Sequence, residues 1–292
     1  CLDNFATGKK ENIQDLKGDP KFRLIEGDIR DLETCRKAVK GVDVVLHQAA
    51  LGSVPRSIAD PATTNAVNIN GFLNMLIATR DAGIKRFVYA SSSSVYGDSP
   101  ELPKVEERTG KVLSPYAITK LVNEEYARVF GNLYGMETIG LRYFNVFGRR
   151  QDPNGPYAAV IPKFTMAFMK YNSPVINGDG SNSRDFTYID NVVMANNLAA
   201  TVENPAALNQ AYNVACGDSV NLNEMTSMLR SYLADKDPKI ATVNPLHGPN
   251  RAGDIPHSMA SIGKAVRLLG YNPQVLFSEG LKRAVEWYVD NL

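Results

Sequence analysis

The fold is decided by one stretch of the sequence, Arg86-Phe87-Val88-Tyr89-Ala90-Ser91-Ser92-Ser93-Ser94. Its apolar half is typical of a buried strand, and its serines mark the loop that follows. Three more runs have this character, and helical patterns separate them. The predicted strands are Phe22–Ile25, Val42–His47, Arg86–Ala90 and Thr138–Arg142, and the predicted helices are Leu32–Lys40, Ala66–Ala82 and Pro115–Tyr134. This alternation predicts a doubly wound α/β fold, with helices on both faces of a parallel sheet.

The regular alternation ends near residue 150. Beyond it lie loops with proline and glycine and shorter helical patterns, such as Asn221–Asp235 and Ser278–Asp290. We therefore expect a doubly wound domain over residues 1–150 and a smaller mixed domain over 151–292 that binds substrate. The segment from about 184 to 202 is expected to return to the first domain.

The composition excludes several classes of protein. Of the 292 residues 44% are hydrophobic and 22% charged, which suits a buried core and excludes a disordered chain. The formal net charge is +1, so no basic surface for nucleic acid is expected. Cys1, Cys35 and Cys216 have the spacing of neither a disulfide framework nor a zinc site, which favours the cytoplasm. The apolar stretch Val42–Leu51 is too short for a membrane span, which needs about 20 residues.

Tyr116 and Lys120 are four residues apart in a helix that is predicted to begin with Ser114 as its N-cap and Pro115 as its first residue. This spacing places the phenol and the ammonium on one helix face. The positive charge then lowers the pKa of the phenol and makes Tyr116 a candidate general base. The alternative is an ordinary exposed helix face, on which such pairs are common.

Polar residues also follow the predicted strands, where the ligand crevice of a doubly wound sheet lies. These residues are Asp28, His47 to Ser53, Ser91 to Ser94, and Tyr143 to Asn145. A hydroxyl of the serine loop is expected beside the phenol of Tyr116, where it donates to a reacting oxygen. The alternative is a serine-rich loop with no chemical role.

Several motifs occur in a characteristic order. They are Ser91-Ser92-Ser93-Ser94-Val95-Tyr96-Gly97, Ser114-Pro115-Tyr116 with Lys120, Leu141-Arg142-Tyr143-Phe144-Asn145-Val146-Phe147-Gly148, Ser183-Arg184-Asp185-Phe186 and Arg251-Ala252-Gly253-Asp254. The chain thereby resembles the extended short-chain dehydrogenase/reductases that act on nucleotide sugars. Within them it is most similar to the bacterial UDP-N-acetylglucosamine/UDP-N-acetylgalactosamine 4-epimerases.

The chain departs from this family at its beginning. The family starts with a strand and a glycine-rich turn that cradles the pyrophosphate of NAD, and this first βα unit is absent here. The segment Cys1–Gly8 resembles the end of the family's second strand. Either the chain is a fragment of a longer gene product or the first βα unit was left out of it. The present polypeptide, if it is complete, is expected not to hold its cofactor.

The resemblance implies NAD as cofactor and the first domain as its Rossmann domain. Asp3 would bind the adenosine ribose and Asp28 the adenine amino group, although Asp28 is alternatively the N-cap of the helix over Leu32–Lys40. His47 is expected to be structural. The full set of implied cofactor residues is Asp3, Asn4, Thr7, Gly8, Asp28, Ile29, Gln48, Ala49, Ala50, Asn68, Tyr116, Lys120 and Tyr143.

The resemblance also implies the chemistry. Tyr116 takes the proton of the sugar 4-hydroxyl, Lys120 lowers the pKa of that phenol and binds the nicotinamide ribose, and Ser92 bridges to the 4-oxygen. Arg184 and Arg251 would clamp the diphosphate, and the small Ser258 would leave room for an acetamido group. The implied substrate residues are Ser53, Ser93, Asn145, Ala159, Val160, Arg184, Arg251, Asp254 and Ser258, and no metal site is implied.

The implied function is the epimerisation of UDP-GlcNAc to UDP-GalNAc at C4, in polysaccharide biosynthesis, by a homodimer joined through two helices of each subunit. Neither a nucleic acid nor a membrane partner is expected. The alternatives are a UDP-galactose 4-epimerase, a nucleotide-sugar dehydratase or decarboxylase, and an inactive NAD-sensing relative or fragment. Dehydratases and decarboxylases of this family carry acidic residues in the serine loop, which Ser92-Ser93-Ser94-Val95 lacks.

Overall fold

The computed structural model describes residues 1–154, 158–250 and 256–292. They form two compact units. The first unit comprises Cys1–Pro100, Glu106–Arg142 and Asn196–Tyr212, and the second comprises Glu101–Val105, Tyr143–Ala195 and Asn213–Leu292. In the prediction the first domain extends to residue 150 and the returning segment covers about 184–202. Here the first long segment ends at Arg142, at the end of a strand, and the returning segment is Asn196–Tyr212.

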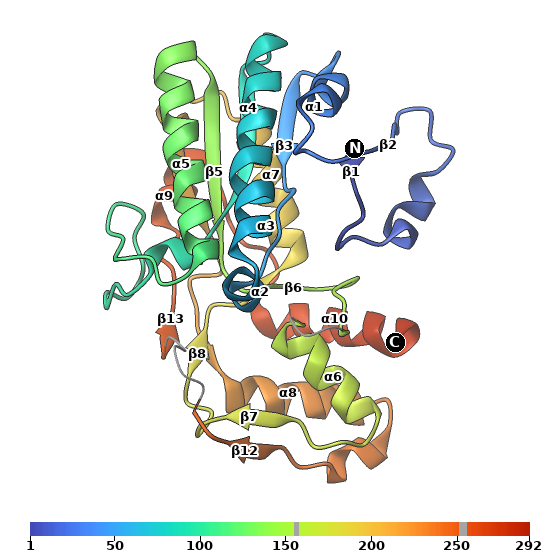
Figure 1. Ribbon diagram of the computed structural model, residues 1–292. Coiled ribbons are helices and arrows are strands. Elements are labelled where there is room, and N and C mark those ends of the chain that lie inside the picture. Colours follow the sequence, from blue (N-terminus) through green and yellow to red (C-terminus); the bar gives the residue numbers. More distant parts are fainter. Residues whose placement is uncertain (155–157, 251–255) are drawn as a thin grey trace. The chain divides into compact units, whose positions relative to one another are not determined.

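The first unit has the expected α/β architecture with a parallel-sheet, Rossmann-like core (Figure 1). Its main sheet has the order β10-β5-β4-β3. These strands are β3 (Val44–His47), β4 (Arg86–Ser92), β5 (Glu137–Tyr143) and β10 (Gln210–Val214). β3 and β4 run parallel, with Val44 opposite Arg86 and His47 opposite Tyr89. β1 (Leu2–Asp3) and β2 (Ile25–Glu26) form a separate two-stranded parallel sheet.

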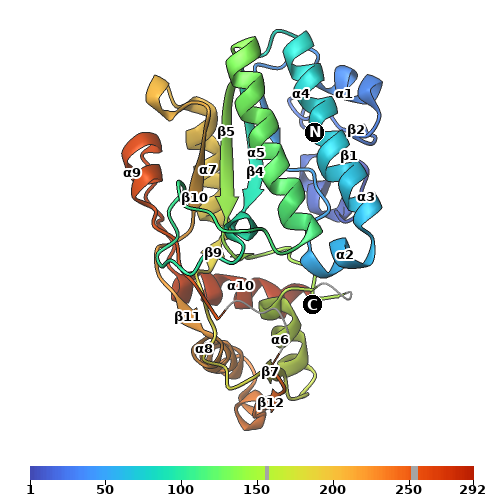
Figure 2. The same ribbon diagram turned by 60° about the vertical axis from the view of Figure 1, so that its left-hand side comes forward.

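Helices of the first unit cover the sheet. They are α1 (Leu32–Val39), α2 (Val54–Ala59), α3 (Pro61–Asn65), the π-helix η2 (Ala66–Gly71), α4 (Phe72–Asp81) and α5 (Pro115–Tyr134), with 3-10 helices η1 (Lys10–Leu16), η3 (Ser93–Tyr96) and η4 (Pro205–Ala207). α4 and α5 lie side by side along the sheet in both views (Figure 2). The predicted limits of α5 are confirmed, because Ser114 accepts from the N–H of Ala117 at its start and Gly135 ends it with φ 65°.

The predicted strand Phe22–Ile25 is largely wrong. Only Ile25 of that run is extended and paired, in β2. The N–H of Phe22 instead donates to the carbonyl of Asp19 at 2.9 Å and closes a turn. The turn through Asp19-Pro20 occupies the N–H of Phe22, which would otherwise donate to a neighbouring strand. The strand therefore begins later in the sequence.

An aromatic core packs two strands of the first unit against a helix. The ring of His47 stacks on Phe87 and meets Phe72 edge to face, with centroids 5.7 and 5.3 Å apart. Phe72 also contacts Tyr89 edge to face at 5.3 Å. Because these rings come from β3, β4 and α4, their packing fixes two strands against one helix.

The second unit has its own hydrophobic core, built around α6 (Val160–Met169), α8 (Leu222–Ala234) and α10 (Phe277–Asn291). Its remaining elements are β6 (Val146–Phe147), β7 (Val175–Asn177), β8 (Ser183–Arg184), β9 (Thr187–Tyr188), α7 (Ile189–Thr201, which ends in the first unit), β11 (Val220–Asn221), η5 (Pro238–Thr242), β12 (Leu246–Gly248), β13 (His257–Ser258) and α9 (Gly263–Leu269). The buried carboxylate of Asp185 accepts three backbone N–H groups, from Cys216, Gly217 and Ala260, and joins three loops. Within the described residues, no helix is both long and apolar enough to cross a bilayer.

Candidate active site

A cavity of about 590 Å³ lies in the first unit, between the ends of β1, β2 and β3. This volume falls in the range of small-molecule and cofactor sites. Nine of the residues predicted to bind a cofactor line it, and they come from separate parts of the chain. They are Asp3, Asn4, Thr7, Gly8, Asp28, Ile29, Gln48, Ala49 and Ala50.

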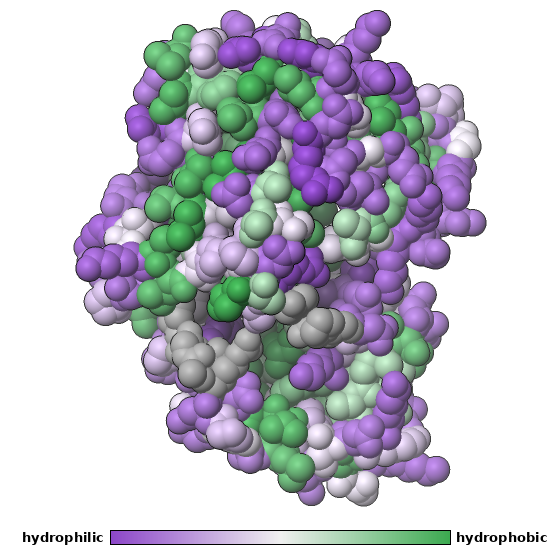
Figure 3. Space-filling view, viewed as in Figure 1, coloured by the Kyte–Doolittle hydropathy of each residue, from purple (hydrophilic) through white to green (hydrophobic). Residues whose placement is uncertain are grey.

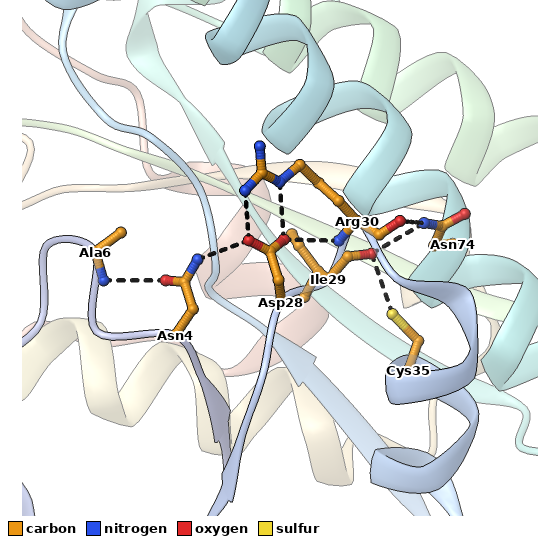
Figure 4. A network of polar contacts seen from close by, with 7 residues as sticks. All are labelled: Asn4, Ala6, Asp28, Ile29, Arg30, Cys35 and Asn74. Atoms are coloured by element: carbon orange, nitrogen blue, oxygen red, sulfur yellow. Dashed lines mark hydrogen bonds and ion pairs between the residues drawn. The ribbon is translucent and has the colours of Figure 1, made fainter.

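Asp28 lies at the centre of a polar network at this cavity (Figure 4). Its carboxylate accepts from Nε and Nη2 of Arg30 at 3.0 and 2.7 Å and from Nδ2 of Asn4 at 2.9 Å. The hydrogen bonds from Arg30 hold the pKa of Asp28 at about 2. Asp28 is not the N-cap of α1, because Asp31 accepts from the first N–H groups of that helix. The alternative role of Asp28 is therefore excluded, and a charged acceptor faces the cavity.

The segment after β1 presents a second carboxylate. Oδ1 of Asp3 accepts the N–H of Phe5 at 2.7 Å, and Oδ1 of Asn4 accepts the N–H of Ala6 at 3.0 Å. The turn brings Gly8 close to Asp3, since a Cβ atom on Gly8 would lie 3.5 Å from Oδ2. A carboxylate held in this way is a suitable acceptor for sugar hydroxyls.

Asn68 shapes the loop after β3. It is buried, and its Oδ1 accepts the N–H of Leu51 at 2.8 Å, while Nδ2 donates to the carbonyl of Leu51 and to Oγ1 of Thr119. Both donors of its amide are thus used within the protein. The prediction of a cofactor contact by Asn68 remains a proposal, and the structure assigns its side chain to the loop.

Tyr116, Ser92 and Lys120 come together where β4 ends and α5 begins. The phenol of Tyr116 and the hydroxyl of Ser92 are hydrogen bonded. Nζ of Lys120 donates to the carbonyl of Ala90 at 2.8 Å and lies 6.0 Å from the centroid of the Tyr116 ring. Lys120 is only 3% exposed, which excludes the ordinary solvated helix face as an explanation of the pair.

Burial controls the charges of these groups. Burial lowers the pKa of Lys120 to about 8, although the negative charge of Glu124 acts to raise it. Burial raises the pKa of Tyr116, and the hydrogen bond with Ser92 opposes the rise. The predicted lowering of the Tyr116 pKa by Lys120 is therefore wrong for this structure, because the ammonium is directed to the Ala90 carbonyl and does not outweigh burial. The pKa of His47 falls to about 3 through burial and the charge of Lys120, so its ring is neutral.

The predicted substrate residues are divided between the two units. In the first unit, Ser53 accepts the N–H of Arg56 as the N-cap of α2, and Ser93 begins η3. In the second unit, Nδ2 of Asn145 donates to the carbonyl of Asp185 at 2.9 Å. Ala159 is the N-cap of α6 and Val160 is the first residue of that helix, while Arg184 lies in β8 and Ser258 in β13. Arg251 and Asp254 lie outside the described residues.

Comparison with known proteins decides the family. Residues 1–215 match the model of the NAD dependent epimerase/dehydratase family. The chain belongs to this family.

Relatives and solved structures agree with the assignment. A putative UDP-glucose 4-epimerase of Methanocaldococcus jannaschii is 36% identical over 99% of this chain and 90% of its own length. A UDP-N-acetylglucosamine 4-epimerase from Methanobrevibacter ruminantium superimposes with a TM-score of 0.92 at 38% identity, covering 100% of this chain and 90% of that one. The UDP-glucose 4-epimerase of Thermus thermophilus, solved with NAD, has a TM-score of 0.85 at 32% identity, covering 100% and 91%. The protein is thus a nucleotide-sugar 4-epimerase that depends on NAD.

The cavity of this epimerase fits its cofactor. The carboxylates of Asp3 and Asp28 are acceptors for hydroxyl and amino groups, and the loop Gln48–Leu51 is held by Asn68. Tyr143, the last residue of β5, belongs to the second unit. Among the described residues no cluster of acidic, histidine or cysteine side chains could hold a metal ion, and NAD chemistry requires none.

Three residues beside the predicted site were missed from the sequence, namely Arg30, Glu124 and Arg142. Arg30 holds Asp28, and Glu124 and Arg142 form a buried cluster with Ser91 behind Ser92. A signal was present for two of the three. Glu124 lies one turn beyond Lys120, and Arg142 is a charge within an apolar strand, which demands a buried partner.

Proposed function

We propose that this epimerase interconverts UDP-GlcNAc and UDP-GalNAc through a transient 4-keto sugar. The observation that carries the substrate is the small side chain of Ser258, which lies opposite Arg184 in the pairing of β13 with β8. A hexose next to a diphosphate bound at Arg184 would lie against the hydroxymethyl side chain of Ser258. This side chain is small enough to leave room for an acetamido substituent. The similarity to a UDP-N-acetylglucosamine 4-epimerase supports the same substrate.

The chain's own residues divide the work of the reaction. Tyr116 accepts the proton of the 4-hydroxyl and later returns it to the 4-oxygen, while Ser92 donates a hydrogen bond to that oxygen. Lys120, one turn beyond Tyr116 on α5, would bind the nicotinamide ribose. NAD, when bound, would supply the hydride acceptor and donor at C4 of the sugar.

The serine loop argues against the other reactions of the family. Elimination of water needs a further acid or base beside the ketone, and Ser92-Ser93-Ser94 offers only hydroxyl groups. Epimerisation needs only one proton acceptor, which Tyr116 provides. The hydrogen-bonded Tyr116 and Ser92 beside a buried Lys120 also argue against an inactive relative.

The proposal is tested with the product of the complete gene. It is assayed on UDP-GlcNAc, UDP-GalNAc, UDP-glucose and UDP-galactose, and NAD released on denaturation is measured by absorbance. We expect turnover of both acetamido sugars. Turnover of UDP-glucose and UDP-galactose alone would show a UDP-galactose 4-epimerase, and no turnover despite bound NAD would show an NAD-binding relative without catalysis.

A homodimer is also proposed. α5 exposes apolar side chains along one side, and Figure 3 shows apolar residues in green over the part of this face that Figure 1 assigns to α5. Ile118, Val129 and Leu133 are 49, 36 and 68% exposed. A second copy that covers this stripe with its own α5 would remove it from water, as the family resemblance implies.

We also place the enzyme in the cytoplasm, which its scattered thiols favour.

A further inference from the structure

Glu124 lies on α5 one turn beyond Lys120 and is almost entirely buried, with 10% of its side chain exposed. Its Oε1 accepts the hydroxyl of Ser91 at 2.5 Å and Nε of Arg142 at 2.9 Å, and its Oε2 accepts Nη2 of Arg142 at 2.8 Å. Short bonds to a charged acceptor are among the strongest hydrogen bonds in proteins. The carboxylate therefore joins α5 to the ends of both β4 and β5.

Arg142 extends this connection. Its Nη1 donates to the phenol oxygen of Tyr96 at 3.1 Å and to the carbonyl of Glu106 at 2.9 Å. The guanidinium also lies 5.0 Å from the centroid of the Tyr96 ring. Tyr96 ends η3, the turn that begins directly after Ser92. The cluster thus holds the serine loop on both sides, through Ser91 before it and Tyr96 after it.

Stability alone does not account for this cluster. Two charges taken out of water lose hydration, and apolar side chains of similar volume often stabilise a core as well or better. Arg86 and Glu137 form a comparable pair, with Nη2 to Oε2 at 2.8 Å, at the opposite ends of the same strands β4 and β5. The two pairs differ in what lies beside them, because only Glu124 binds the residue next to Ser92 and lies one turn from Lys120 on α5.

We propose that Glu124 is a positioning residue of the epimerase site, which holds the loop bearing Ser92 against the helix that bears Tyr116 and Lys120. The proposal rests on the roles of Tyr116, Lys120 and Ser92 given above. The hydroxyl of Ser92 and the phenol of Tyr116 need a fixed separation if they are to act on the same proton. They belong to different elements, β4 and α5. The bond from Ser91 to Glu124 sets that separation from one residue away.

Glu124 also acts on the charge of Lys120. The groups that face this ammonium are His47 from β3, the carbonyl of Ala90 from β4, and Tyr116 and Glu124 from α5. His47 is neutral, so Glu124 is the anion in this set that favours the ammonium form. When the charge of Glu124 is removed, less remains to oppose the lowering of the Lys120 pKa by burial. The Lys120 pKa then falls further.

The test compares three variants of the epimerase. Glu124→Gln removes the charge, Ser91→Ala removes the bond to the loop and keeps the ion pair, and Glu137→Gln is the matched control at the other ends of β4 and β5. We expect kcat to fall by roughly 100-fold in Glu124→Gln and roughly tenfold in Ser91→Ala, with KM unchanged, as for a misplaced reacting group. Glu137→Gln should keep the kcat of the wild type.

A second measurement does not depend on turnover. NMR titration of ¹³C-labelled lysine should show a lower midpoint for Lys120 in Glu124→Gln than in the wild type or Glu137→Gln. An unmoved Lys120 midpoint in folded Glu124→Gln overturns the proposal even if the substrate is not the one proposed. Where Glu124→Gln fails to fold, Ser91→Ala decides, and an unchanged kcat in that variant overturns the positioning role.

Discussion

Ser258 lies opposite Arg184 in the parallel pairing of β13 with β8, and His257 lies opposite Ser183 in the same register. Neighbouring strands are about 4.8 Å apart, so the two side chains belong to one short stretch of surface in the second unit. In a UDP-sugar the β-phosphate is bonded directly to the hexose. The roles proposed for Arg184 at the phosphate and for Ser258 at the sugar therefore require the two residues to be neighbours, and the register of β13 with β8 meets this requirement.

Arg184→Ala is expected to raise KM for the UDP-sugar while kcat stays nearly constant. The loss of a charge-assisted contact with a phosphate costs about 1.5–3 kcal/mol, which corresponds to roughly a tenfold to hundredfold rise in KM. Steady-state kinetics and inhibition by free UDP measure the effect. Arg283→Ala, which removes an exposed arginine paired with Glu279 on α10, is the control. Equal inhibition of the Arg184→Ala variant and the wild type by UDP would show that Arg184 does not bind the diphosphate.

Ser258→Tyr is expected to abolish turnover of UDP-GalNAc and to spare UDP-galactose. The larger ring fills the space proposed for the acetamido group, so specificity changes through a clash. The ratio of kcat/KM for the two sugars reports the change. Ser231→Tyr, on the exposed side of α8, controls for the added ring. Undiminished turnover of UDP-GalNAc by Ser258→Tyr would remove the basis of the assignment.

Tyr116→Phe is expected to abolish turnover and to leave the fold and the NAD content intact. Only a hydroxyl is removed, and with it the proton acceptor and the partner of Ser92. Activity is compared at matched NAD content with that of Tyr126→Phe, which alters a half-buried tyrosine of the same helix. If Tyr116→Phe keeps the activity of the Tyr126→Phe control, another residue is the base.

The pKa of Lys120 predicts a dependence of stability on pH. Burial lowers this pKa from 10.5 to about 8. Between these values the unfolded chain binds a proton that the native chain does not, so the free energy of unfolding rises with pH across this window. The rise is at most roughly 3 kcal/mol, because each pKa unit corresponds to 1.36 kcal/mol. Denaturant titrations of the wild type and Lys120→Met from pH 7 to 10.5 should differ in this slope, and parallel curves would contradict the buried ammonium.

Leu133→Glu is expected to convert the proposed dimer into a monomer. Leu133 is 68% exposed on α5, and a carboxylate there would be buried unpaired in the contact between two copies. Sedimentation at micromolar concentration gives the mass. Leu246→Glu alters an apolar residue that is 57% exposed in β12 and should leave the mass unchanged. A wild type that sediments as a monomer would contradict the dimer itself.

The elements with strong local signals were predictable from the sequence. α5 has a serine cap, a proline in its first turn and a glycine after its last residue, and both of its ends are as predicted. β4 and β5 are long apolar runs, and their predicted positions differ from the observed ones only at the ends. Local signals failed where a turn competed for the same backbone donor, as at Phe22.

The composition of the site was more predictable than its electrostatics. The spacing of Tyr116 and Lys120 correctly placed both on one face of a helix, but spacing does not reveal burial or the Ala90 carbonyl that binds the ammonium. The direction of the Tyr116 pKa shift depends on both. The partners Glu124 and Arg142 meet only through the tertiary fold, because 18 residues separate them along the chain.

The bonds among Ser91, Glu124 and Arg142 make the two ends of the cofactor-dependent site unequal in local stability. Opening of any one of these segments breaks charge-assisted bonds of the others, so their amides should exchange hydrogen only when the whole unit unfolds. At the other end, β1 and β2 have two residues each, and η1 contains no buried residue. The proposed dinucleotide site around Asp3 and Asp28 therefore lies in a part of the unit that should open locally more readily than the proposed proton-transfer groups.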